Sequence, residues 1–328
     1  MKSSSTRQLR ILYFGTPGFA VPALQALLTS RHEVVAVISQ PDRPKGRGHR
    51  LAATPTKELA VLCGVPVLQP TRLKDDAFLA DVVALRPDLG VVAAYGRILP
   101  DALLVLPRLG MINVHASLLP KYRGAAPVHR AVVAGDAETG VTIMRVVSEL
   151  DAGPMIETVR RRIDTDETSV QVEQGLAELG AGILVDVVDR LSEGPVTEVP
   201  QEHALATYAP KITKAEGAID WALPAAAIHN LVRGLQPWPL VAVTLDGVRC
   251  AIYRTSLSQP SGATIVPKGT AAEPGTVVTA AGDMLTIAAG DGRLIRIVEI
   301  QPDGRRVMNA RDFLSGRTVS VGTRLLPL

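Results

Sequence analysis

Short apolar segments alternate with segments of helical spacing over the first half of the chain, and this alternation limits the possible folds most strongly. The apolar segments lie at residues 9–14, 33–39, 65–68 and 89–93. Strands that are apolar on both faces and separated by helices are typical of a parallel sheet covered by helices on both sides. The sequence therefore predicts an α/β domain with a mostly parallel sheet.

The character of the sequence changes after Pro195. Residues 196–215 show no sustained spacing of apolar residues typical of a helix or a strand, and they are predicted to form a linker. One helical segment follows, and then short strands separated by Asp-Gly and Gly-Asp turn signals, a pattern that predicts a small β-barrel or sandwich. The 328 residues suit two domains. We therefore expect a first domain at residues 7–195 and a second at 216–328.

Composition excludes several classes of protein. The two cysteines, Cys63 and Cys250, lie far apart, so neither a disulfide framework nor a zinc site is expected, and each thiol is expected to be a small buried apolar group. Gly15 and Pro17 interrupt the apolar N-terminal segment, which argues against a signal peptide. We expect a cytoplasmic monomer without a metal or a membrane span.

Charge is unevenly distributed along the chain. Residues 1–204 carry 22 basic and 23 acidic side chains, whereas residues 205–328 carry 13 and 9. The excess of positive charge in the last third is a weak indication of a polyanionic partner.

An amide and an imidazole, Asn113 and His115, end the predicted strand at residues 110–115. Residues two apart on a strand point to the same side, so the two side chains share a face. An amide N–H and a protonated imidazole, placed together, can both stabilise an oxyanion. Asp151 follows the next predicted strand, and we expect it to orient the imidazole. The three side chains together predict a catalytic site.

The turn after the first strand, GTPG at residues 15–18, lies where dinucleotide-binding enzymes bind phosphate. It lacks the middle glycine of the G-x-G-x-x-G pattern, and Pro17 removes an N–H group. A nicotinamide dehydrogenase is therefore not expected.

Several segments resemble the folate-dependent formyltransferases. The strongest are INVHASLLPKYRGAAP, which matches the pattern N-x-H-x-S-L-L-P followed by a G-x-x-P turn, and SELDAGPMI, which contains D-x-G. FGTPGFAV, VVAAYGRILP and YAPKITKAEGAIDW also match in order along nearly the whole chain. The resemblance implies a Rossmann-like formyltransferase domain and a C-terminal OB-like β-barrel.

The resemblance also implies the reaction and the residues that perform it. The formyl donor would be 10-formyltetrahydrofolate, and the acceptor the α-amine of methionyl-initiator tRNA. Asn113, His115 and Asp151 would be catalytic. The residues implied to bind folate are Ser117, Leu118, Leu119 and Pro120, together with Tyr95 and Ile98.

A basic segment, QPDRPKGRGHR at residues 40–50, directly follows the second strand and is expected to form a mobile loop. The resemblance implies that such a loop contacts acceptor-stem phosphates. The residues expected to bind tRNA are Arg43, Lys45, Arg47, Arg50 and, in the later part of the chain, Lys211.

Two alternatives remain open at this stage. One is an enzyme of the same N-terminal fold that formylates a ribonucleotide amine or an amino sugar, or that hydrolyses formylfolate. The other is a tRNA-binding protein whose enzyme-like domain is inactive. The basic loop and the appended β-domain favour a tRNA substrate, and the presence of all three catalytic residue types favours an enzyme.

Overall fold

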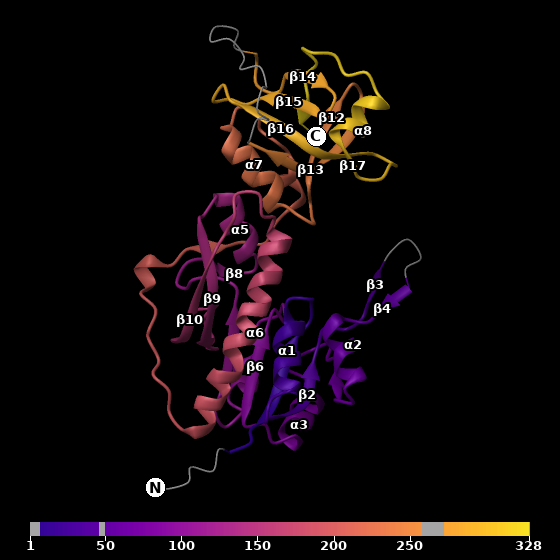
Figure 1. Cartoon of the computed structure of the whole chain (residues 1–328). Helices are drawn as coiled ribbons and strands as arrows, with labels where there is room; N and C mark the ends of the chain where they lie inside the picture. Colours follow the sequence, from indigo (N-terminus) through magenta and orange to yellow (C-terminus); the bar gives the residue numbers. More distant parts are fainter. Residues whose placement is uncertain (1–6, 46–49, 258–271, 328) are drawn as a thin grey trace. The chain divides into compact units, whose positions relative to one another are not determined.

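The computed structural model of the chain describes residues 7–45, 50–257 and 272–327. Two compact units make up the fold (Figure 1). The first comprises Met1–Pro127, Glu138–Arg161 and Glu173–Pro210, and the second comprises Val128–Ala137, Arg162–Val172 and Lys211–Leu328. Among the helices described, none is both long enough and apolar enough to cross a membrane.

A seven-stranded sheet forms the centre of the first unit. Its order is β5 (Val67–Leu68), β2 (Glu33–Ile38), β1 (Arg10–Gly15), β6 (Leu89–Ala93), β7 (Met111–His115), β9 (Glu138–Arg145) and β10 (Met155–Arg162). The strands from β5 to β7 are parallel, whereas β9 runs antiparallel to β7. The predicted α/β class with a mostly parallel sheet is confirmed.

Helices cover both faces of this sheet. They are α1 (Ala20–Leu28), α2 (Pro55–Leu62), α3 (Asp76–Ala84), α4 (Asp101–Leu104) and α6 (Ser169–Glu193). The helix α5 (Pro127–Ala134) belongs from Val128 onward to the second unit. On one face of β1, Phe14 belongs to a buried cluster with Phe78 of α3 and Leu103 of α4. On the other face, the Tyr13 hydroxyl donates to the Ala20 carbonyl oxygen of α1. Burial on both sides therefore explains why β1 is apolar after Arg10.

The second unit contains the curled antiparallel sheet β14-β15-β16-β13-β12-β18, with β17 paired to β16. The elements are α7 (Ala225–Gly234), β12 (Val241–Leu245), β13 (Val248–Ser256), β14 (Val277–Ala281), β15 (Met284–Ala288), β16 (Leu294–Pro302), β17 (Met308–Asn309), α8 (Ala310–Ser315) and β18 (Leu326–Pro327).

The C-terminal segment closes this sheet. Its last strand pairs with β12, and just before that strand Leu325 N donates to the Gly275 carbonyl oxygen at 2.8 Å, next to β14. The segment therefore joins the two ends of the sheet, and the predicted OB-like barrel is confirmed. Gly247 and Gly282, in two of the predicted turns, have positive φ, as tight hairpin turns require.

Three local predictions differ from the structure. The segment expected as a basic loop contains a hairpin of β3 (Arg43–Lys45) and β4 (Arg50–Ala52). The predicted linker contains a short strand in its second half, β11 (Tyr208–Ala209), which pairs with β8 (Arg123–Gly124) in the first unit. Cys250 is buried as expected, but Cys63 is exposed at the end of α2. A mobile loop is also expected from the sequence at residues 256–275, and of these, residues 258–271 lie outside the described residues.

Candidate active site

Asn113 and His115 lie on one face of β7, as the alternation of a strand predicts. On the opposite face, α6 approaches so closely that a Cβ on Gly180 would lie 2.8 Å from Val114 Cγ1. Met111, on the face of the polar pair, belongs to the core cluster that contains Leu103 of α4. The two polar side chains therefore point away from α6 and toward the side of the sheet on which α4 lies.

The ring of His115 is held at both nitrogens. Its Nε2 lies 3.0 Å from the Tyr122 carbonyl oxygen, which can only accept, so Nε2 carries the hydrogen. Its Nδ1 lies 3.7 Å from Asp151 Oδ2. This separation exceeds a direct hydrogen bond, so the carboxylate acts on the ring through its charge. The ring, 5% exposed, is oriented chiefly by the Tyr122 carbonyl.

Asp151 reaches His115 through a returning loop, and not directly from the end of the next strand. Because β9 is antiparallel, its last residue, Arg145, pairs with Ile112, and the chain must turn back before it reaches Asp151. Asp151 has φ +48, in the left-handed region that few non-glycine residues adopt. Its Oδ2 accepts from Gly124 N at 2.8 Å, and this hydrogen bond fixes the carboxylate beside the ring.

The turn after β7 is fixed by hydrogen bonds of its own. Thr142 of β9 donates through Oγ1 to the Ser117 carbonyl oxygen at 2.8 Å and accepts from Leu119 N at 3.2 Å. The Ser117 hydroxyl donates to the Lys121 carbonyl oxygen at 2.6 Å. Ser117 therefore uses its side chain to close the turn, and Thr142 was not anticipated from the sequence.

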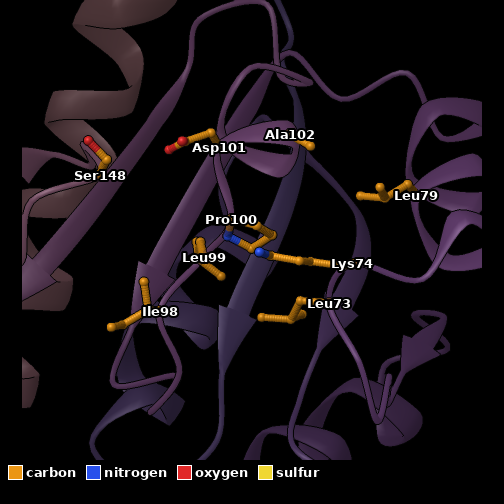
Figure 2. A pocket seen from close by; sticks show the side chains of 9 residues that line it. All are labelled: Leu73, Lys74, Leu79, Ile98, Leu99, Pro100, Asp101, Ala102 and Ser148. Atoms are coloured by element: carbon orange, nitrogen blue, oxygen red, sulfur yellow. The ribbon is translucent and has the colours of Figure 1, made fainter.

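A pocket of about 710 Å³ opens in the same unit (Figure 2). Its residues come from the segment before α3, from α3 itself, from the start of α4 and from the loop that also carries Asp151: Leu73, Lys74, Leu79, Ile98, Leu99, Pro100, Asp101, Ala102 and Ser148. Apolar walls with a few polar groups, at this volume, are typical of small-molecule sites. Figure 2 shows the ammonium end of Lys74 turned inward toward Pro100.

The six predicted folate residues occupy different places. Ile98 lines the pocket and is 75% exposed, so its side chain is available to a ligand. Tyr95 is buried, with its ring edge-on to Phe14. Leu119 is buried and Leu118 and Pro120 are half-buried in the turn after β7. Other lining residues, such as Leu73, Lys74 and Leu79, lie outside every motif recognised in the sequence, so sequence reasoning did not anticipate them.

The predicted tRNA-binding residues are only partly described. Arg43 is exposed and donates to Gln40 Oε1 at 3.1 Å, and Gln40 Nε2 in turn donates to the Tyr95 carbonyl oxygen at 2.8 Å. Hydrogen bonds from Gln69 and Lys57 lower the pKa of Asp42 at the base of the hairpin. Lys211 is exposed in the second unit. Lys45 and Arg50 lie on the paired strands of the hairpin, and Arg47 lies outside the described residues.

Within the part of the chain that the structure describes, no group of three or more His, Cys, Asp or Glu side chains is placed to hold an ion. Asn113, His115 and Asp151 instead provide a neutral donor, a titratable ring and an anion. This combination can stabilise negative charge on a carbonyl oxygen and move a proton.

Comparison with known proteins agrees with this chemistry. Residues 8–188 match the sequence model described as formyl transferase, and residues 211–318 match that of the formyl transferase C-terminal domain. The chain therefore belongs to the formyl transferase family.

Its relatives within that family include proteins named methionyl-tRNA formyltransferase. That of Trichlorobacter lovleyi is 43% identical over 97% of both chains, and that of Methylococcus capsulatus is 44% identical over 97% of this chain and 99% of the relative.

Solved structures share the fold at low identity. An N-formyltransferase from Helicobacter canadensis, in complex with folinic acid and dTDP-3-aminofucose, has a TM-score of 0.66 and 16% identity, covering 90% of this chain and all of that one. HypX from Aquifex aeolicus, in complex with tetrahydrofolic acid, has a TM-score of 0.64 and 14% identity. The match covers 97% of this chain and 51% of the HypX chain.

Proposed function

We propose that this chain transfers the formyl group of 10-formyltetrahydrofolate to the α-amine of methionyl-initiator tRNA. The observation that supports this chemistry is that His115 Nδ1 and Asp151 Oδ2 lie 3.7 Å apart. Asn113 lies on the same strand as His115, two residues before it. The near full-length likeness to methionyl-tRNA formyltransferases supports the choice of acceptor.

Asn113, His115 and Asp151 each have a separate role in the proposed reaction. As the amine nitrogen bonds to the formyl carbon, the carbonyl electron pair moves to the formyl oxygen. Asn113 donates a hydrogen bond to that oxygen, and protonated His115 offsets its charge. Asp151 takes the proton that the attacking nitrogen must lose and passes it to the folate nitrogen as the bond between that nitrogen and the formyl carbon breaks, so Asp151 returns to its carboxylate form. The carbonyl then re-forms on the product amide, so electrons and protons balance.

Asn113 is suited to this role because it is half-buried and, among the described residues, its side chain makes no hydrogen bond. A side-chain amide without a protein partner is free to donate to a bound substrate. The Tyr122 carbonyl keeps the His115 ring from rotating, so the oxyanion meets an amide donor and an imidazole ring that are already in place.

The pocket suits the folate donor in its chemistry. Its apolar walls, formed by side chains such as Leu73, Ile98 and Leu99, match a flat heteroaromatic ring. Lys74 places a positive charge in the same pocket, which complements the carboxylates of a folate tail. The loop of Ser148 also carries Asp151, so donor binding and the proton acceptor share one segment.

The direct test is a purified-protein assay. We expect formyl transfer from 10-formyltetrahydrofolate to charged initiator tRNA, and at least 100-fold lower kcat/KM with amino-sugar nucleotides or ribonucleotide amines. Faster formylation of a small amine would favour the alternative enzyme, and tight tRNA binding without transfer would favour a binding protein. The proposal includes a monomer acting in the cytoplasm, and light scattering measures the oligomeric state.

Truncation of Ile98 tests the folate pocket. Ile98 is 75% exposed in this structure, and a bound donor would cover it. Because a fully buried aliphatic side chain contributes roughly 1.5 to 3 kcal/mol, Ile98→Ala is expected to raise KM for the folate about 10-fold with little change in kcat. Val105→Ala is the matched control, since Val105 is 76% exposed and does not line the pocket. Equal effects of the two changes would contradict the assignment.

Removal of the Arg43 charge tests the basic hairpin. Arg43→Ala is expected to raise KM for methionyl-tRNA about 10-fold and to reduce the salt dependence of tRNA binding, because one phosphate contact is lost. Folate binding should not change. Arg108→Ala is the control, because Arg108 pairs with Asp88, which precedes the parallel strand β6, whereas the hairpin follows the carboxyl end of β2. A loss of folate affinity equal to the loss of tRNA affinity would count against the hairpin.

A further inference from the structure

A buried arginine and a buried glutamine lie against the loop that carries Asp151, which we call the catalytic loop. Arg123 is 1% exposed and Gln201 is 5% exposed. Arg123 donates through Nε and Nη2 to Gln201 Oε1, at 3.0 Å and 2.8 Å. Its remaining charged contact is with Glu149 at 3.5 Å, a carboxylate that is 59% exposed. Gln201 is therefore the closest acceptor of a buried cation.

The other end of the Gln201 amide is bound to the catalytic loop. Its Nε2 donates to the Asp151 carbonyl oxygen at 2.9 Å and to the Gly153 carbonyl oxygen at 2.8 Å. Because the arginine can only donate and the carbonyls can only accept, the amide has one possible orientation. Arg123 thus fixes the direction in which Gln201 points its two donor hydrogens.

This arrangement holds Asp151 from two sides. The Gly124 N–H, next to Arg123 in the chain, binds the Asp151 carboxylate, and the Arg123 side chain acts through Gln201 on the Asp151 backbone. A non-glycine residue in the left-handed region is strained and persists only where its surroundings fix it. Asp151 is such a residue, with φ +48.

We infer that Gln201 is a positioning residue for formyl transfer, which holds the carbonyls of residues 151 and 153 so that the Asp151 carboxylate stays beside His115. The inference rests on the proposed function. Gln201 lies in the segment between the two domains, far in sequence from the catalytic motifs. A glutamine fits because it offers one acceptor and two donor hydrogens on a single flat group.

Gln201→Glu separates this role from a purely structural one. Glutamate still accepts from Arg123, so the buried cation keeps a partner and the melting temperature should stay within a few degrees. Glutamate cannot donate to the two carbonyls, so the loop is released. Because small displacements of catalytic groups are costly, we expect kcat to fall about 10-fold to 100-fold, with KM for both substrates within about twofold. The pH dependence of kcat should shift as well.

Gln301→Glu is the matched control. Gln301 also uses both ends of its amide, since Oε1 accepts from the Tyr253 hydroxyl at 3.0 Å and Nε2 donates to the Arg305 carbonyl oxygen at 2.7 Å, within the barrel unit. Its substitution should leave kcat and the pH profile unchanged. Gln201→Asn adds an uncharged variant whose shorter side chain cannot span both partners, and its kcat should fall as well.

The outcomes of these measurements are distinct. A folded Gln201→Glu or Gln201→Asn enzyme with the kcat of the original protein would overturn the inference and leave the proposed function intact. A loss of kcat in the Gln301→Glu control equal to that of Gln201→Glu would also overturn it. An original protein that transfers no formyl group to methionyl-tRNA would instead overturn the proposed function.

Discussion

Asp151→Asn is expected to lower kcat for formyl transfer by about 10²-fold to 10⁴-fold, the range typical of removing a general base. The amide oxygen of asparagine can still accept from Gly124 N, so the side chain should keep its place. What it loses is the negative charge near His115 Nδ1 and the capacity to take a proton. KM for both substrates should change little, and steady-state kinetics with charged initiator tRNA measures the split.

The control for this change is Asp81→Asn, because Asp81 is exposed on α3. Its kinetics should match those of the original protein. An Asp151→Asn enzyme within fivefold of the original kcat would show that the carboxylate is not the proton acceptor. The charge stabilisation by Asn113 and His115 would then account for catalysis without it.

Gly153→Ala is expected to destabilise the first unit and to abolish most activity. A Cβ at this position would lie 2.0 Å from the Arg145 carbonyl oxygen. Arg145 is the last residue of β9, and its backbone is fixed by the sheet, so the loop itself must move. Overpacking commonly costs about 1 to 3 kcal/mol, and a clash with backbone should cost about 3 kcal/mol or more. Urea unfolding measures the change in the free energy of unfolding.

Gly182→Ala provides the opposite expectation for the same chemical change. Gly182 lies within α6, and a Cβ there would meet nothing within 4 Å. Alanine in a helix is favoured over glycine by about 1 kcal/mol, so this variant should be more stable than the original protein. If Gly153→Ala proved as stable as Gly182→Ala, the tight turn between β9 and Asp151 would not exist as described.

The sequence allowed much of the first unit to be predicted because each element carries its own signal. After a charged first residue in β1 and in β2, the strands β1, β2 and β6 are apolar because both of their faces are buried. The face shared by Asn113 and His115 follows from the period of a strand alone. The basic hairpin was harder to predict, because the Pro and Gly residues around Arg43 are typical of a loop. The pairing of Pro44 with Leu51 shows that the segment forms two strands.

What the sequence by itself determined is therefore local: the strand and helix periods, the turn residues, and which residue types are available for catalysis. The tertiary structure decided where they meet. The antiparallel direction of β9 requires a returning loop, and that loop brings Asp151 to His115. The hydrogen bonds of Gln201 with Arg123 and with the carbonyls of residues 151 and 153 join residues that are 48 to 78 positions apart. Contacts over such separations depend on how the whole unit packs, and no local pattern records them.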